Sequence, residues 1–200
     1  MRKIVVLGTA LVMALSVCAA SAAPLAQPRD ERLAARTAPT AGDLGVRYRR
    51  ESAAEVHAAR LSCPARTTGC AWRFFALPDD PHGIASATAL VEVCATAAQA
   101  RSAYGAAMRS LSRKRKVSAA GIQQTISLRS EAHLSPGGAQ ATLLVFRLTQ
   151  TAPARMTETS RSILVLEGRA QLFVSYKVGR TVDFAATARR LAARMQPARG

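Results

Sequence analysis

The densest group of side chains that could do chemistry is the basic run Arg113, Lys114, Arg115 and Lys116. Adjacent cations neutralise phosphates and release their counterions, which gives an affinity that falls with salt. The run also follows a predicted helix, where cations meet the free carbonyls of the helix end and stay solvated. The solvated interpretation is favoured, and polyanion binding by these four residues is the alternative.

A second candidate is the aromatic cluster Trp72-Arg73-Phe74-Phe75. Alternation along a strand puts Trp72 and Phe74 on one face and Arg73 and Phe75 on the other. The favoured interpretation is a core strand with both faces covered. The alternative is an apolar groove for a ligand or peptide, lined by Trp72 and Phe74.

The cysteines suggest one disulfide. Cys63 and Cys70 bracket a turn-rich loop, and closing it would stabilise the fold by about 2–3 kcal/mol on the chain-entropy model. We predict the pair Cys63–Cys70, with Cys70–Cys94 as the next choice. Cys94 would then be a buried thiol on a strand.

No catalytic, metal or cofactor motif stands out. The histidines, His57, His82 and His133, are not at metal spacing from one another, and G-x-S-x-G, HExxH, G-x-G-x-x-G and P-loop patterns are absent. We therefore predict no catalytic residue, no metal and no cofactor. An active site could still form if a histidine, a thiol or a hydroxyl converged in the fold.

The N-terminus has the layout of a signal peptide. Met1–Lys3 is basic, Ile4–Val17 is apolar and uncharged, and Ala20–Ala22 is a run of small residues suited to cleavage. We predict export to the periplasm or the medium, with no membrane span after cleavage. A lipid anchor on Cys18 is disfavoured because the β-branched Val17 precedes it.

The charge is high. The 200 residues carry a net charge of +16, and loss of Arg2 and Lys3 with the signal peptide would lower it by two, to +14. Such a charge attracts nucleic acid, lipopolysaccharide, wall polymers or anionic lipid surfaces. The excess of Arg and the abundance of Ala could equally reflect the bias of a whole proteome.

Composition and periodicity divide the chain into three parts. After the signal peptide (1–22), residues 23–45 are rich in Ala, Pro, Thr and Arg and predict a flexible leader, in which residues 30–36 could form a helical turn. Residues 46–200 predict one domain. Its expected helices cover 51–61, 96–113 (with a capping box at Thr96) and 182–195 (with Thr181 or Asp183 at its N-terminus). Its expected strands cover or include 71–77, 85–94, 122–128, 144–148, 159–166 and 170–178, and Glu167-Gly168 predicts a tight turn between the last two.

This order predicts an α+β fold, β-β-α-β-β-β-β-α, in which both main helices pack on one face of an antiparallel sheet of about six strands. Over roughly residues 70–195 the element order is similar to that of the PsbP/Mog1-like sandwich, without a shared motif. Fold likeness carries no function by itself.

These observations favour an exported non-enzymatic binding or accessory protein that recognises polyanions or envelope components through its basic surface. The alternative is a small exported hydrolase whose site assembles only in the fold. An envelope-associated role, with the leader as a spacer, is a third possibility.

Overall fold

A computed structural model of the chain describes residues 26–45, 48–50, 63–64, 67–77, 87–119, 122–176 and 181–199. Its helices are α2 (Pro28–Thr37), α3 (Ala41–Leu44), α5 (Ala97–Ser112) and α6 (Phe184–Met195), with short 3₁₀ turns η1 (Pro136–Gly138) and η2 (Gln196–Ala198). Its strands are β1 (Arg49–Arg50), β2 (Gly69–Ala76), β3 (Ala87–Val93), β4 (Arg115–Ala119), β5 (Ile122–Leu134), β6 (Gln140–Ala152), β7 (Met156–Glu167) and β8 (Ala170–Tyr176). The predicted signal peptide and the predicted helix over 51–61 lie outside the described residues.

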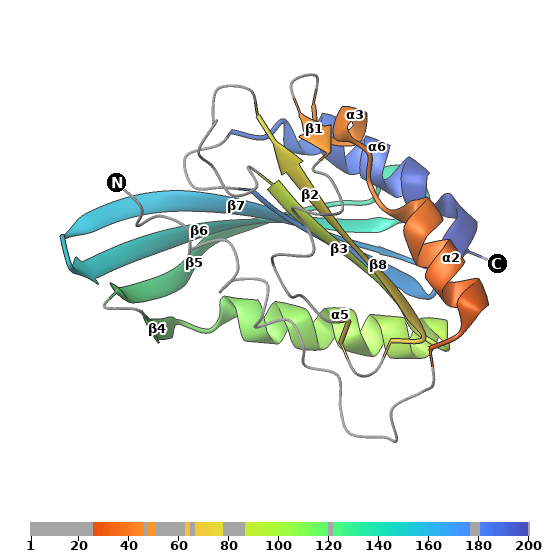
Figure 1. Cartoon of the computed structure of the whole chain (residues 1–200), viewed down its shortest axis with the longest axis horizontal. Helices are drawn as coiled ribbons and strands as arrows, with labels where there is room; N and C mark the ends of the chain where they lie inside the picture. The colour runs from red at the N-terminus through yellow and green to blue at the C-terminus, as the bar shows by residue number, and fades with distance from the viewer. Residues whose placement is uncertain are drawn as a thin grey trace.

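The strands form one curled antiparallel sheet in the order β1-β2-β3-β8-β7-β6-β5-β4 (Figure 1). The predicted α+β class is confirmed, and the expected β2–β3 and β7–β8 hairpins pair. Two short edge strands, β1 and β4, raise the number of strands to eight. They were missed because both are short and rich in basic residues, so neither has the apolar alternation that signals a strand.

Helices cover both faces of the sheet. Alternate residues of β7 divide between two apolar clusters: Ile163 and Val165 pack with α2, α3 and α6, whereas Leu164 packs with α5. The prediction that both main helices share one face is therefore wrong. The reason lies in β8, which is buried at every position. Phe173 interrupts its polar face, and α5 covers the apolar surface that results.

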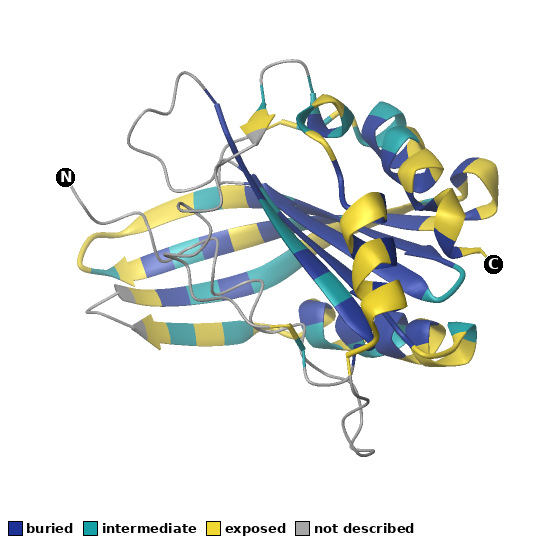
Figure 2. Ribbon diagram, turned by 45° about the vertical axis from the view of Figure 1, so that its right-hand side comes forward, coloured by how far each residue is buried: buried dark blue, intermediate teal, exposed yellow. Residues whose placement is uncertain are grey.

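Burial decreases where the sheet extends beyond the helices. Figure 2 shows strands buried beneath the helices and mixed exposure at the far ends of the long strands. In β7 the first two residues are exposed and the last six are buried. Within the described residues, no helix combines the length and hydropathy that crossing a membrane requires.

The predicted flexible leader is wrong for residues 26–45, which include α2 and α3. α2 packs on β2 and β3 and buries Leu33, Ala34 and Thr37. Gly69 permits this contact, because a Cβ at that position would lie 2.3 Å from the carbonyl carbon of Asp30. The segment has the composition of a linker because it carries only one narrow apolar stripe. A helix this short is not stable alone, so its stability comes from packing on the sheet.

Both later helices begin within two residues of their predicted starts, each at a side-chain cap. Thr96 Oγ1 accepts a hydrogen bond from the backbone N–H of Gln99 at 3.2 Å, and Asp183 Oδ1 accepts one from Ala186 at 3.0 Å. Gly168 makes the tight β7–β8 turn with a φ of +55°. These features depend on neighbours in the sequence, so no tertiary contact is needed to predict them.

Candidate anion-binding pocket

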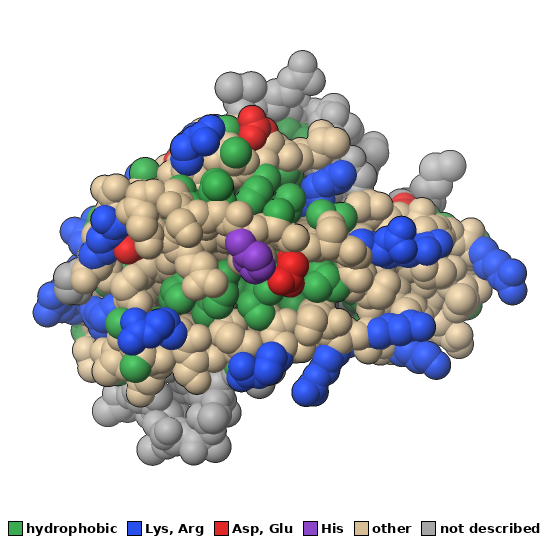
Figure 3. All heavy atoms as spheres, turned by 180° about the vertical axis from the view of Figure 1, so that it is seen from behind, with side chains coloured by type: hydrophobic (Ala, Val, Ile, Leu, Met, Phe, Trp, Pro, Cys, Tyr) green, Lys and Arg blue, Asp and Glu red, His purple; other side chains and the backbone are tan. Residues whose placement is uncertain are grey.

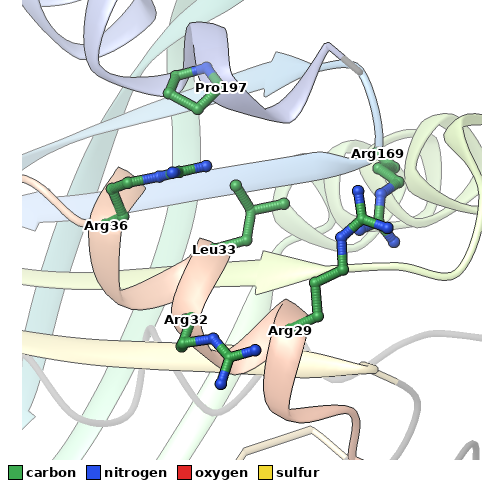
Figure 4. Close-up of a pocket in the computed structure, with 6 residues that line it drawn as sticks. All are labelled: Arg29, Arg32, Leu33, Arg36, Arg169 and Pro197. Carbon is green, nitrogen blue, oxygen red and sulfur yellow. The ribbon is translucent and has the colours of Figure 1, made fainter.

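A pocket of about 390 Å³ opens beside α2, the β7–β8 turn and η2. Four arginines, one leucine and one proline line it: Arg29, Arg32, Leu33, Arg36, Arg169 and Pro197. Figure 4 shows Arg29 beside Arg169 at one end, Arg36 toward the other, and Leu33 between them. Among the described residues no carboxylate lines the pocket, so its lining is strongly basic.

Three of the arginines come from one side of α2. Arg29, Arg32 and Arg36 are three and four residues apart, which places them along one face of a helix with 3.6 residues per turn. All three side chains are exposed. Within the described chain, none of their guanidinium groups has a hydrogen bond or salt bridge. Their donors are therefore available to an anion.

The fourth arginine is held by a buried acid. Arg169 Nη1 donates to Asp30 Oδ2 at 3.1 Å and to the carbonyl of Cys94 at 3.1 Å, and Arg169 Nη2 donates to Asp30 Oδ1. The side chain of Asp30 is only 1% exposed. The hydrogen bond from Arg169 lowers the pKa of this carboxyl despite its burial. Asp30 therefore stays ionised and ties α2 to the β7–β8 turn.

Neighbouring arginines have a different role. Arg190 Nε and Arg194 Nε donate to backbone carbonyls of α3 and of the residue after α2, at 2.9 and 3.2 Å. Arg199 Nε pairs with Glu167 at 2.7 Å. These side chains hold α3, the end of α2 and the C-terminal turn in place through hydrogen bonds, whereas the three arginines of α2 make no such bond within the described residues.

The basic run lies away from this pocket, in the connection after α5 and the first two residues of β4. Arg113, Lys114 and Lys116 are exposed. Arg115 instead pairs in register with Ile126, and its Nε and Nη2 atoms are buried without a hydrogen-bond partner. This burial lowers the pKa of Arg115. Since α5 and α2 cover opposite faces of the sheet, the run and the pocket are separate, and polyanion binding by the run stays a prediction.

Trp72 and Phe74 lie on the α5 side of β2. Their rings stack with centroids 6.3 Å apart. Phe74 is buried, and Trp72 is half-buried against the α5-side cluster. The favoured interpretation as a core strand agrees with this placement, and ligand binding at these aromatics stays a prediction.

The cysteines pair as expected. Cys63 and Cys70 form a disulfide with a Cα–Cα distance of 5.8 Å, and Cys94 is a buried thiol outside this disulfide. No cluster of three or more His, Cys, Asp or Glu side chains suited to a metal occurs in the described part of the chain.

One histidine belongs to a hydrogen-bonded chain. His133 Nε2 lies 3.0 Å from Glu131 Oε1, and His133 Nδ1 lies 2.9 Å from Thr142 Oγ1, which is 2.6 Å from the Tyr104 hydroxyl. Figure 3 shows a histidine beside an acidic side chain, with apolar side chains near them and arginines or lysines around the rim. Thr142 has no exposed surface, so a substrate cannot reach this hydroxyl. His57 and His82 lie outside the described residues.

Sequence reasoning missed the arginines of α2 because they fall in the predicted leader. A signal was present: Arg29, Arg32 and Arg36 share a helical face, and Leu33, Ala34 and Thr37 form a stripe beside it. Comparison with models of protein families found no match, and comparison with curated protein sequences found none either. The pocket is therefore interpreted from its own chemistry.

Proposed function

We propose that this protein is an exported, non-enzymatic binding protein that recognises anionic ligands at the arginine pocket of α2. One observation carries the proposal: Arg29, Arg32 and Arg36 line a pocket with Arg169, and no hydrogen bond or salt bridge occupies their guanidinium groups among the described residues. Guanidinium groups donate in a planar fork that suits phosphate and carboxylate oxygens.

The charge of the whole chain supports this role. A net charge of +16 steers anions toward the protein before any contact forms. The arginines of α2 then offer donors at a defined place, because Asp30 bonds to Arg169 and interacts with Arg29 only through the weaker attraction of their charges. We therefore assign recognition to α2 and long-range attraction to the remaining surface.

The compartment favours such ligands. The N-terminal pattern predicts export, and the Cys63–Cys70 disulfide is consistent with an oxidising extracellular compartment. Anionic envelope components, such as lipopolysaccharide and acidic wall polymers, are the polyanions that an exported protein would meet. Nucleic acid outside the cell is a further candidate.

The test is a salt series with matched variants. The exported, purified protein is titrated with heparin, lipopolysaccharide and duplex DNA, together with the triple variant R29Q/R32Q/R36Q. The control variant R113Q/K114Q/K116Q removes the same number of charges from exposed positions of the basic run. We expect the α2 variant to bind more weakly and to lower the slope of log K against log salt for DNA by up to about 2.7, since each neutralised phosphate contributes about 0.9.

The control decides which cations are responsible. Equal losses of affinity in both variants would make the effect one of net charge, and a larger loss in the control would move the site to the basic run.

The hydrolase alternative has one observation in its favour, the contacts of His133 with Glu131 and Thr142. We prefer binding because the Thr142 hydroxyl is fully buried.

A further inference from the structure

We infer that the α2 pocket recognises a phosphate monoester whose ester-linked body is apolar. This inference rests on the proposed function, because it names the ligand class of the same site. It follows from three properties of the pocket: the number of available guanidinium groups, the apolar part of the wall, and the fixed position of the helix.

The number of donors favours a phosphate monoester over other anions. Arg29, Arg32 and Arg36 each present a guanidinium without a hydrogen bond or salt bridge among the described residues. A monoester has three terminal oxygens and a charge of about −1.5 to −2 at pH 7. A carboxylate has two oxygens and a single charge, and so does each phosphodiester of a nucleic acid. Of these three anions, the monoester brings the most acceptor oxygens and the most negative charge to the three available guanidinium groups.

The positive charges of the α2 arginines repel one another, and an anion with more than one negative charge would offset this repulsion best. The carboxylate of Asp30 is buried and bonded to Arg169, so it does not line the pocket. Glu31 follows on α2 at about 200° around the helix axis from Arg29, on the far side of the helix. Arg32 and Arg36 therefore keep their positive charge toward the pocket, and the charge of Asp30 partly offsets that of Arg29.

The wall between the charges is apolar. Leu33 lies in the middle of the pocket and Pro197 of η2 borders it (Figure 4). The methylene stems of the arginines add further apolar surface, since such side chains bury their stems and leave the head group in water. The pocket volume of about 390 Å³ lies in the range of small-molecule sites. It exceeds the few water volumes, about 30 Å³ each, that a phosphate alone would displace, so room remains for an apolar body.

The helix that carries the arginines is held in place before a ligand arrives. Asp30 bonds to Arg169, and Arg73 of β2 donates to the carbonyl of Ala35 at 3.3 Å. Gly69 lets the helix backbone lie directly on β2. Because α2 is already held in place, little conformational entropy of the protein is lost when a ligand binds. A small ligand can therefore bind without first having to order the site.

The test uses octyl phosphate as the probe. Isothermal titration at constant ionic strength and pH 7.5 compares it with octyl sulfate, octanoate and inorganic phosphate. We expect saturable one-to-one binding of octyl phosphate, at least about tenfold tighter than each comparison ligand, because a factor of ten needs only about 1.4 kcal/mol. The preference over octyl sulfate should shrink at pH 5, where the phosphate monoester has lost its second charge.

Variants separate the outcomes. R29Q/R32Q/R36Q should weaken octyl phosphate binding at least about tenfold, while R113Q/K114Q/K116Q should leave it unchanged. The arginines of α2 are exposed, so a thermal unfolding curve equal to the wild type confirms that the variant is folded. Equal affinity for octyl phosphate, octyl sulfate and octanoate would overturn the inference yet leave the proposed function standing if α2 still controls heparin binding. Loss of any dependence on α2 in both assays would overturn both.

Vesicles distinguish the source of the monoester. Phosphatidylcholine vesicles containing phosphatidic acid present a phosphate monoester, and vesicles containing phosphatidylglycerol present a diester. Preferential binding to phosphatidic acid supports a lipid head group as the source. Binding of octyl phosphate without a preference between the vesicles supports a soluble phosphate ester.

Discussion

Replacing Asp30 with Asn would remove the charge that ties α2 to the β7–β8 turn. The Asp30 side chain is 1% exposed and that of Arg169 is 20% exposed. Removing one partner of a fully buried pair costs about 3–5 kcal/mol, because the other charge is left without compensation. Water can reach part of Arg169, so we expect the free energy of unfolding to fall by about 2–3 kcal/mol.

Chemical denaturation at pH 7 measures this loss, and a double-mutant cycle with R169Q separates the pair from other effects. The double variant should lose less than the sum of the single losses, because either change alone already breaks the bond. A loss below about 0.5 kcal/mol in D30N, or additive losses in the cycle, would refute the assignment of this pair as the anchor of α2.

The same pair predicts a pH dependence. Its hydrogen bonds lower the pKa of Asp30 below the ordinary value of 3.8, so the folded protein keeps the carboxylate ionised where the unfolded chain takes up a proton. The stability that Asp30 contributes is present above the unfolded pKa and is lost as the pH falls through the lower, folded pKa. The difference in stability between wild type and D30N should be constant from pH 5 to 7 and shrink below about pH 4.

Three further predictions concern the sheet and its helices. Burial raises the pKa of Glu92 to about 7, so between about pH 4.5 and 7 the folded state keeps a proton that the unfolded chain loses. The free energy of unfolding should therefore fall as the pH rises through this range. E92Q should flatten this slope in denaturation curves, and an unchanged slope would contradict the prediction. G69A would place a Cβ against the backbone of Asp30. It should lower the free energy of unfolding by about 1–3 kcal/mol, measured by calorimetry, and weaken heparin binding, measured by titration. Unchanged values would show that α2 does not pack as described. T96A should lower stability by about 1 kcal/mol through loss of the α5 cap, and S102A, a change on the exposed side of α5, should not.

Local chemistry made much of the fold predictable. The cap of α5 at Thr96, the cap of α6 at Asp183 and the turn at Gly168 involve residues within four positions of each other. The Cys63–Cys70 bond closes a loop with a sequence separation of 7. Such features hardly depend on the rest of the chain, so the composition and spacing of neighbours are enough to predict them.

The sequence by itself therefore determined the α+β class, the later helices and hairpins, the disulfide and the basic charge. Only the tertiary structure decided which faces the helices cover and where a binding site forms. Asp30 and Arg169, which anchor the pocket, are 139 positions apart. Residues 26–45 look like a linker because α2 is too short to be stable alone, and it becomes a helix by burying Leu33 and Ala34 against strands that follow much later in the chain.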